Sequence, residues 1–367
     1  MVPRAMDHAG RLHRLEKALS ASELDVLLVT HLPNIRYLTG FTGSSAALLA
    51  GERGAVLFTD GRYLMQAKQE ARNVRVVIGS KAPLIAAAEW LLAQQQRGGR
   101  RYLGIEPESL TAGGRKRLGS VLGGKATVRF APPLIERARM VKDAAEIGRI
   151  REAVSLGASL FSVARREIRP GVREAEVAAA MEYEARRRGA EGMSFPTILA
   201  SGPRSAIVHG RASMERIRRG GFVVCDFGVI LAGYCSDRTC TVHVGQPSRD
   251  RRAFYEAVRE AQQAAIECAK PGVPTGEVDE AARSVLRKWK LAKYFTHSTG
   301  HGLGLEIHEG PRLAAGQAEK LEPGMVVTIE PGAYIPGKQG VRIEDVVVIT
   351  ASGCEPLTAT EKDLVVL

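Results

Sequence analysis

The sequence predicts a two-domain α+β protein, with a smaller α/β domain at residues 1–131 and a larger α+β domain at residues 132–367. Three observations support this prediction. The length of 367 residues suits about two domains. Short β-rich runs alternate with helical stretches in the first third of the chain. After the adjacent prolines Pro132 and Pro133, helix-rich and strand-rich blocks follow one another without strict alternation.

Apolar periodicity predicts the individual elements. In the first domain we expect strands at residues 25–30, 55–58, 74–78 and 101–105, and helices at residues 11–19, 63–71 and 84–96. In the second domain, residues 134–188 are rich in helix formers with apolar residues three and four apart. Beyond Pro196, β-rich runs are interrupted by two helical segments, at residues 250–269 and 276–290.

Composition and charge exclude several classes of function. Hydrophobic residues make up 45% of the chain and charged residues 25%, which is typical of globular proteins and not of disordered ones. The net charge of +12 is spread along the chain without aromatic interleaving, so we expect no nucleic-acid partner. No apolar run approaches the roughly 18 residues of a membrane span, so we expect no membrane association.

The cysteines and the N-terminus indicate the cellular compartment. The chain has five cysteines, an odd number, without a Cys-x-x-Cys pair, so a disulfide framework is not expected. The first residues lack the apolar stretch of a secretion signal. We therefore expect a cytoplasmic protein. Cys225 directly precedes Asp226 in a strand and should point to the opposite face, which favours a buried structural cysteine over a thiolate ligand.

Two aspartates lie within a predicted β-hairpin at residues 222–242. If its turn centres on residues 231–233, Asp226 and Asp237 oppose each other, with their Cα atoms about 4.5 to 5.5 Å apart. Removing each carboxylate from water costs several kcal/mol, so a positive partner must lie between them. For this pair alone, an arginine such as Arg238 is the favoured partner, with a metal ion as the alternative.

Two further carboxylates change this balance. Glu330 ends an apolar strand at residues 325–330, and Glu344 lies within another at residues 341–349, on the same face as Arg342. Four carboxylates in strands can be neutralised by two divalent cations but not by one arginine. The sequence therefore predicts a dinuclear metal site.

A histidine-rich segment lies between these strands. It contains His297, His301 and His308, together with glycines that make a helix costly at about 1 kcal/mol each. We expect an extended or looped segment whose glycines let the backbone approach a crowded site. Oxygen-rich ligation with one imidazole suits Mn, Co, Fe or Zn. Two such ions can acidify a water and polarise a carbonyl, which indicates hydrolysis of an amide or similar bond.

At this point the sequence resembles the pita-bread metallopeptidases (family M24), in the branch of Xaa-Pro aminopeptidase and Xaa-Pro dipeptidase (prolidase). The resemblance covers nearly the whole chain. In the second domain it rests on Asp226 with Asp237 eleven positions on, Thr299-Gly-His301-Gly, Ile307-His308-Glu, Thr328-Ile-Glu330-Pro-Gly and Val341-Arg-Ile-Glu344-Asp. In the first it rests on Asn34-Ile-Arg-Tyr-Leu-Thr-Gly-Phe41 and Phe58-Thr-Asp-Gly-Arg-Tyr63, which resemble a creatinase-type N-terminal domain.

The resemblance implies a role for each candidate site residue. Two divalent ions per chain, with manganese favoured over cobalt or zinc, would be held by five ligands: Asp226, Asp237, His301, Glu330 and Glu344. Asp237 and Glu344 would bridge the ions, and Glu330 would also handle a proton. His209 and His308 would contact the scissile carbonyl. His297 would lie beside the proline-accepting pocket, and Arg342 would contact substrate or a ligand carboxylate.

The expected activity is hydrolysis of the bond between an N-terminal residue and a following proline, as in an Xaa-Pro aminopeptidase that is a homodimer. The alternative is an Xaa-Pro dipeptidase restricted to dipeptides. A methionine aminopeptidase would leave the first domain unexplained, and a creatinase would not need the metal ligands. A non-catalytic pita-bread module would be expected to lack ligands, whereas this set is intact.

Overall fold

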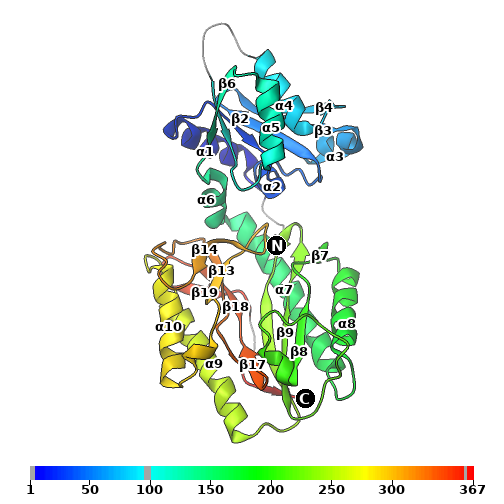
Figure 1. Ribbon diagram of the computed structural model, residues 1–367, viewed down its shortest axis with the longest axis vertical. Coiled ribbons are helices and arrows are strands. Elements are labelled where there is room, and N and C mark those ends of the chain that lie inside the picture. The colour runs from blue at the N-terminus through cyan, green and yellow to red at the C-terminus, as the bar shows by residue number, and fades with distance from the viewer. Residues whose placement is uncertain (1–4, 95–100, 359–361) are drawn as a thin grey trace. The chain divides into compact units, whose positions relative to one another are not determined.

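The structure is a computed structural model that describes residues 5–94, 101–358 and 362–367 (Figure 1). The chain divides into two compact units, Ala5–Arg139 and Met140–Leu367. The first unit thus extends beyond residue 131 and includes α6 (Leu134–Met140) up to Arg139. Arg139 is buried and donates a hydrogen bond from Nη1 to Asn34 Oδ1 over 2.7 Å, which ties α6 to this unit. Among the described residues no helix is long and apolar enough to cross a membrane.

The first unit is a six-stranded sheet in the order β4-β3-β2-β1-β5-β6. Its strands are β1 (Val26–Val29), β2 (Ala46–Gly51), β3 (Gly54–Asp60), β4 (Arg75–Gly79), β5 (Arg101–Ile105) and β6 (Ala126–Phe130). Its helices are α1 (His8–Ala21), α2 (Leu32–Thr39), α3 (Leu64–Glu70), α4 (Pro83–Ala93) and α5 (Ala112–Leu122). Leu91 of α4 and Leu118 of α5 pack with the sheet in one hydrophobic core.

The four strands and three helices expected in this unit are confirmed, although residues 95 and 96 of the third helix lie outside the described residues. The elements α2, β2, α5 and β6 were not expected. Their sequences are short or rich in glycine, which weakens the periodic signal: α5 contains Gly113 and Gly114, and α2 spans only eight residues with Pro33 in its first turn. The two helices are therefore stabilised by packing rather than by helix propensity.

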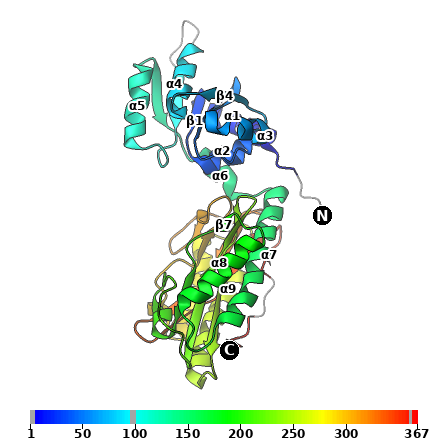
Figure 2. The same ribbon diagram turned by 90° about the vertical axis from the view of Figure 1, so that its right-hand side faces the viewer.

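In the second unit the strands lie between two helix pairs, as Figures 1 and 2 show from two directions. One pair is α7 (Ala144–Glu167) and α8 (Glu174–Arg187), and the other is α9 (Arg249–Cys268) and α10 (Thr275–Lys288). Buried residues of α7 and α8, such as Leu160 and Met181, pack on one set of strands. Buried residues of α9 and α10, such as Val258 and Leu286, pack on the other.

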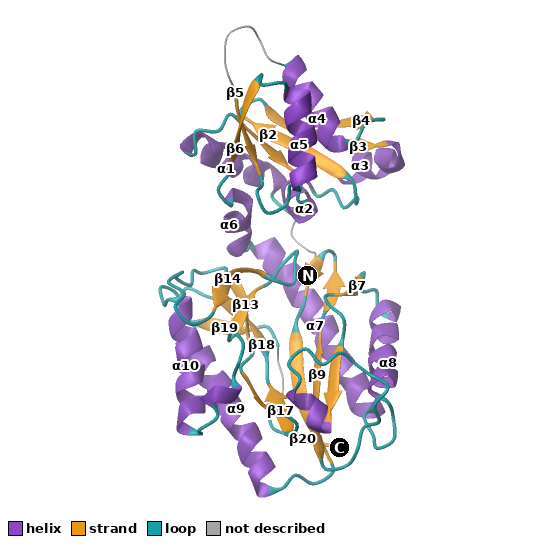
Figure 3. Cartoon of the chain, in the orientation of Figure 1, coloured by secondary structure: helices purple, strands orange, loops and turns teal. Residues whose placement is uncertain are grey.

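Figure 3 distinguishes the strands of this unit from the helices that cover them. One sheet has the order β20-β12-β9-β8, and another the order β14-β13-β15-β18-β19. Their strands are β8 (Ile198–Ser201), β9 (Gly221–Phe227), β12 (Arg238–Val244), β13 (Gly300–Gly302), β14 (Glu309–Leu313), β15 (Val326–Ile329), β18 (Asp345–Ile349), β19 (Cys354–Pro356) and β20 (Val365–Val366). Smaller sheets contain β7 (Gly192–Met193), β10 (Val229–Leu231), β11 (Tyr234–Cys235), β16 (Gly332–Ile335) and β17 (Gln339–Arg342).

The hairpin that carries the two aspartates has a different register from the expected one. Ala232 and Gly233 both have positive φ, 49° and 82°, which is typical of the two-residue turn that joins twisted antiparallel strands. The turn therefore consists of Ala232 and Gly233, with Leu231 paired with Tyr234. Asp226 pairs with Thr239 and not with Asp237, so the predicted direct opposition is wrong. Asp237 lies two residues before Thr239 and therefore still shares the face of Asp226.

The strand expected at residues 341–349 is also divided. It forms β17 and β18, with Ile343 and Glu344 between them. The glycine-rich segment is extended at β13, as expected. A Cβ on Gly300 would lie 1.9 Å from Thr328 O, and one on Gly302 would lie 2.1 Å from Gly310 O. These glycines therefore let β13 lie close to the backbones of its neighbours.

Candidate metal centre

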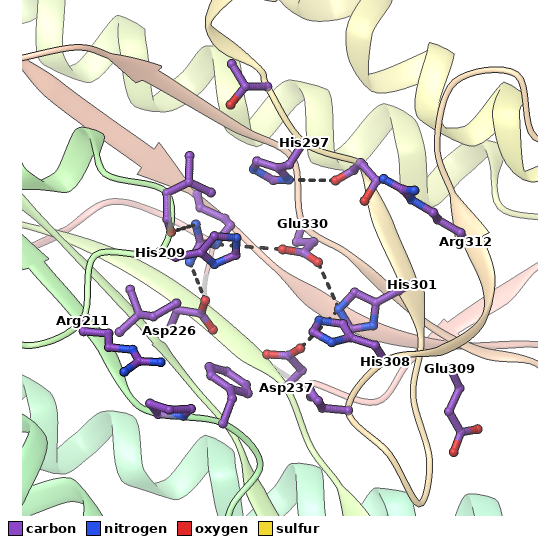
Figure 4. Close-up of a pocket in the computed structure, with 18 residues that line it drawn as sticks. His209, Arg211, Asp226, Asp237, His297, His301, His308, Glu309, Arg312 and Glu330 are labelled. Carbon is purple, nitrogen blue, oxygen red and sulfur yellow. Dashed lines mark hydrogen bonds and ion pairs between the residues drawn. The ribbon is translucent and has the colours of Figure 1, made fainter. Parts of the chain in front are cut away.

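Three carboxylates converge between the two sheets of the second unit, and Figure 4 shows two of them, Asp226 and Asp237. Asp226 lies near the end of β9, Asp237 lies just before β12, and Glu344 lies between β17 and β18. One ligand oxygen of each residue lies within 4.8 Å of those of the other two, and all three residues are buried. Residues separated by more than a hundred positions are thus brought together by strand pairing.

Glu330 and His301 complete this group. Glu330 directly follows β15, and its Oε1 lies 3.3 Å from Nε2 of His301 in β13. The same Nε2 lies 3.6 Å from Oδ2 of Asp237. The structure therefore brings the five expected ligand residues to one place.

The orientation of the His301 ring suits a metal ligand. Its Nδ1 lies 3.0 Å from Gly302 O and, as the donor, carries the proton. In the neutral ring the lone pair of Nε2 then faces two carboxylate oxygens, an arrangement that requires either a proton or a metal ion. Burial opposes a charge on this ring, but the hydrogen bond with Glu330, the charges of Glu330 and Asp226, and the bond to Gly302 O together raise the pKa of His301.

The electrostatics of the four carboxylates indicate a missing positive charge. Burial raises the pKa of Asp237 and of Glu344 well above their usual ranges, and neighbouring carboxylates reinforce both shifts. Burial also raises the pKa of Asp226 in spite of Arg342. For Glu330, burial opposes ionisation, but the hydrogen bond with His301 and the charges of His301, His297 and Arg342 together lower its pKa to about 2. The cluster therefore cannot hold four negative charges on its own.

Two carboxylate oxygens of the cluster show whether these residues fit metal ions. Among the described residues, neither Oδ1 of Asp226 nor Oε1 of Glu344 has a hydrogen-bond partner, although both atoms are buried. A buried acceptor without a donor costs about 1–3 kcal/mol. Divalent cations would satisfy both oxygens and offset the negative charge. The five residues therefore fit a site for divalent metal ions.

Arg342 lies beneath this cluster and is almost completely buried. It donates from Nη2 to Asp226 Oδ2 and from Nε to Thr239 Oγ1 over 3.0 Å. Its Nη1 donates to Val208 O over 3.0 Å and to the Tyr334 hydroxyl over 2.8 Å. Every nitrogen of the guanidinium group is thus engaged with protein oxygens. Of the two expected roles, contact with substrate or with a ligand carboxylate, this arrangement favours the second, with Asp226 as the carboxylate.

The remaining expected histidines line the same cavity. His297 accepts a hydrogen bond at Nε2 from the Tyr334 hydroxyl over 2.9 Å and donates from Nδ1 to Ser298 O over 2.8 Å. Burial lowers the pKa of His297 and that of His308, which favours neutral rings. The His308 ring contacts that of His301 edge to face, with centroids 4.4 Å apart. His209 enters from the loop after β8 and is exposed.

The cavity above the cluster has a volume of about 720 Å³, which is enough for a small peptide. Phe195, Ile198 and Ile307 contribute apolar surface to its wall. Arg211 and Arg312 line it as well, and both are exposed. Neither arginine forms an ion pair with any residue that the structure describes. Neither these arginines nor Tyr334 is recognisable from the sequence, because no local motif marks residues that meet only through folding.

Comparisons with known proteins agree with this site. Residues 148–351 match metallopeptidase family M24, and residues 11–141 match the creatinase/prolidase N-terminal domain. The chain is 38% identical to a protein named Xaa-Pro dipeptidase from Pyrococcus horikoshii over 357 residues, covering 97% of this chain and 98% of that protein.

Solved structures of similar proteins lead to the same family. The structure matches an Xaa-Pro dipeptidase from Bacillus anthracis with a TM-score of 0.94 at 37% identity, covering 98% of this chain and 100% of the other. It also matches an X-Pro aminopeptidase from Thermotoga maritima with a TM-score of 0.88 at 35% identity, covering 97% and 99%. The creatinase/prolidase match accounts for the first unit, which the methionine aminopeptidase alternative left unexplained. The chain is therefore a hydrolase with a pita-bread fold, and it belongs to metallopeptidase family M24.

Proposed function

We propose that this chain is an Xaa-Pro dipeptidase, which hydrolyses dipeptides whose second residue is proline. The expectation from the sequence was an Xaa-Pro aminopeptidase, with the dipeptidase as its alternative. The names of similar proteins support the alternative more, because Xaa-Pro dipeptidases occur among them with nearly complete coverage of both chains.

The buried carboxylate cluster is the observation that carries the proposal. Two divalent ions held by Asp226, Asp237, His301, Glu330 and Glu344 would supply a Lewis acid that polarises a carbonyl and acidifies water. Glu330, which lies beside His301 in the cluster, is the carboxylate that would take up a proton there. His308 and His209, on the cavity wall, are placed to donate hydrogen bonds to a carbonyl oxygen that gains charge.

The two pocket arginines support a preference for dipeptides. A dipeptide places a free carboxylate directly after its proline, whereas a longer peptide has an amide bond there. Arg211 and Arg312 offer guanidinium groups to the cavity that are free of ion pairs with described residues. Arginine binds carboxylates with paired hydrogen bonds, so these side chains would favour a substrate that ends at proline.

The test is the rate of hydrolysis of four related substrates with Mn²⁺, Co²⁺ and Zn²⁺ added in turn. We expect rapid cleavage of Ala-Pro, slow cleavage of Ala-Pro-amide and Ala-Pro-Ala, and little cleavage of Ala-Ala. Equal rates on Ala-Pro and Ala-Ala would contradict an Xaa-Pro activity. Faster hydrolysis of Ala-Pro-Ala than of Ala-Pro would favour the aminopeptidase. Manganese as the native metal, the homodimer and the cytoplasmic location stay predictions.

A further inference from the structure

The loop that carries His209 is closed by a buried carboxylate outside the metal cluster. This loop runs from the end of β8 through residues 202–212, and its first part forms a short helical turn at Gly202–Ala206. Glu174, the first residue of α8, lies under it and has no exposed surface. The carboxylate of Glu174 therefore makes its contacts within the protein.

The contacts of Glu174 join the two ends of this loop. At the entrance, Ser201 donates from its backbone N–H and its hydroxyl to Oε1, each over 2.8 Å. At the exit, Ser213 donates from its backbone N–H over 3.1 Å and from its hydroxyl over 2.7 Å to Oε2. Arg204, within the loop, donates from Nε to the same carboxylate over 3.1 Å. One side chain thus fixes both ends of the segment that presents His209.

The rest of the loop has further anchors, one of which is a β-bridge between Arg211 and Ile198. Arg204 donates from Nη2 to Arg211 O over 2.9 Å, which closes a second, smaller ring around His209. Beyond this ring, Gly340 N–H donates to Ser205 Oγ and Arg342 to Val208 O. His209 itself is exposed, so its position depends on the backbone that holds it. An exposed loop would be mobile without such contacts.

We propose that Glu174 is a positioning residue for His209, and that it keeps this imidazole within reach of the scissile carbonyl. The proposal rests on the proposed function, in which His209 stabilises charge that develops on that oxygen. Glu174 does not line the cavity and touches no candidate metal ligand among its hydrogen-bond partners. A substitution of Glu174 should therefore change turnover only by altering the conformation of the loop at residues 202–212.

The variant Glu174→Gln tests this proposal with little change in volume. Its amide nitrogen would meet N–H donors at one end of the loop, so contacts at that end are lost. Misplacing a catalytic group by about 1 Å can cost up to about 10²-fold in rate. We expect kcat for Ala-Pro to fall about 10-fold to 10²-fold, with KM nearly unchanged and metal content equal to that of the wild type.

A double-mutant comparison separates positioning from general damage. In a His209→Ala background, adding Glu174→Gln should lower kcat no further, because the residue through which Glu174 acts is gone. A full additional loss in that background would overturn the proposal, as would an unchanged kcat in Glu174→Gln alone. If Glu174→Gln does not fold, Ser213→Ala removes one donor at the loop exit and should give a smaller loss of kcat that also vanishes in His209→Ala.

Glu106→Gln is the matched control. Glu106 is a buried glutamate of the first unit that likewise accepts backbone N–H groups, from Thr30 over 2.6 Å and from His31 over 2.8 Å. Loss of the Glu106 carboxylate in this variant should lower the melting temperature without lowering kcat for Ala-Pro.

Hydrogen exchange distinguishes failure of this inference from failure of the proposed function. In Glu174→Gln, amides of residues 202–212 should exchange faster than in the wild type, while those of α9 keep their protection. Unchanged exchange in the loop would overturn the proposal whatever the substrate. If the wild type does not cleave Ala-Pro but loop exchange rises in the variant, the proposed function fails and the positioning of His209 stands.

Discussion

Two groups of buried carboxylates in the second unit differ in how completely their oxygens are paired. Glu174, Asp279 and Asp345 each have a cationic partner, which is Arg204, Arg283 or Lys362 respectively. Asp279, for example, accepts bonds from Arg283 and from the backbone N–H and hydroxyl of Thr299. By contrast, the metal cluster leaves Asp226 Oδ1 and Glu344 Oε1 without a described partner.

This difference separates carboxylates that are neutralised by protein cations from those that have unpaired oxygens available for a bound cation. When a buried carboxylate is fully paired, removing its partner destabilises the native state, because an uncompensated charge is left in the interior. A buried carboxylate with free oxygens weakens the native state until a cation arrives. The same distinction applies to the arginines, because Arg342 is engaged by protein oxygens whereas Arg211 and Arg312 face the cavity.

The largest effect is expected from Asp237→Asn, which would break the cluster. A bound metal ion contributes several kcal/mol to stabilising the charge that develops in the transition state. Loss of an ion should therefore lower kcat by at least about 10³-fold. Metal content, measured by elemental analysis, should fall below two ions per chain. A fully active variant would show that Asp237 is not a ligand.

The matched substitution in the paired group is Asp279→Asn. Without metal, Asp237→Asn should raise the melting temperature, because it replaces a group that burial and neighbouring carboxylates make harder to ionise in the folded than in the unfolded state. Asp279→Asn should lower it, because breaking a buried ion pair costs about 3–5 kcal/mol. Shifts of the same sign in both variants would mean that the two groups do not differ.

His308→Ala sharpens the boundary of the cluster. The ring of His308 contacts that of His301 but is assigned to substrate and not to metal. Its removal should lower kcat by about 10² to 10³, the usual cost of losing one donor to an oxyanion. Elemental analysis should still give two ions per chain, and loss of one ion would instead make His308 a ligand.

Arg312→Ala extends the comparison to the pocket arginines. The side chain is exposed, so solvent weakens its attraction for a carboxylate, and we expect KM for Ala-Pro to rise about tenfold. KM for Ala-Pro-amide should stay unchanged, since that substrate has no carboxylate. An equal rise for both substrates would argue against a carboxylate contact.

The smallest effect is the pH dependence of stability in the metal-free protein. The folded pKa of Asp237 and Glu344 lies above the unfolded value of about 4, so their contribution is fully present below that pH and is lost as pH rises through the folded pKa. From pH 5 to pH 8, metal-free wild type should therefore lose a few degrees in melting temperature relative to metal-free Asp237→Asn. A constant difference between the two proteins would contradict the raised pKa values.

The amino-acid sequence by itself was enough to find the cluster. Carboxylates inside apolar strands, such as Glu330 at the end of β15, are recognisable because covalent order fixes which residues precede and follow them. The glycines around His301 likewise excluded a helix from local conformational cost alone. The family resemblance rested on such short motifs, and the match to family M24 confirmed it.

Only the tertiary structure decided how those residues meet. The register of the hairpin placed Asp226 opposite Thr239, and packing between distant strands gave Arg342 its partners. The contact of Glu174 with Ser213 spans 39 positions, and that of Arg342 with Val208 spans 134. Local sequence patterns report which side chains are buried. Which buried atom finds a partner depends on chain segments far away in the sequence, and only folding brings them together.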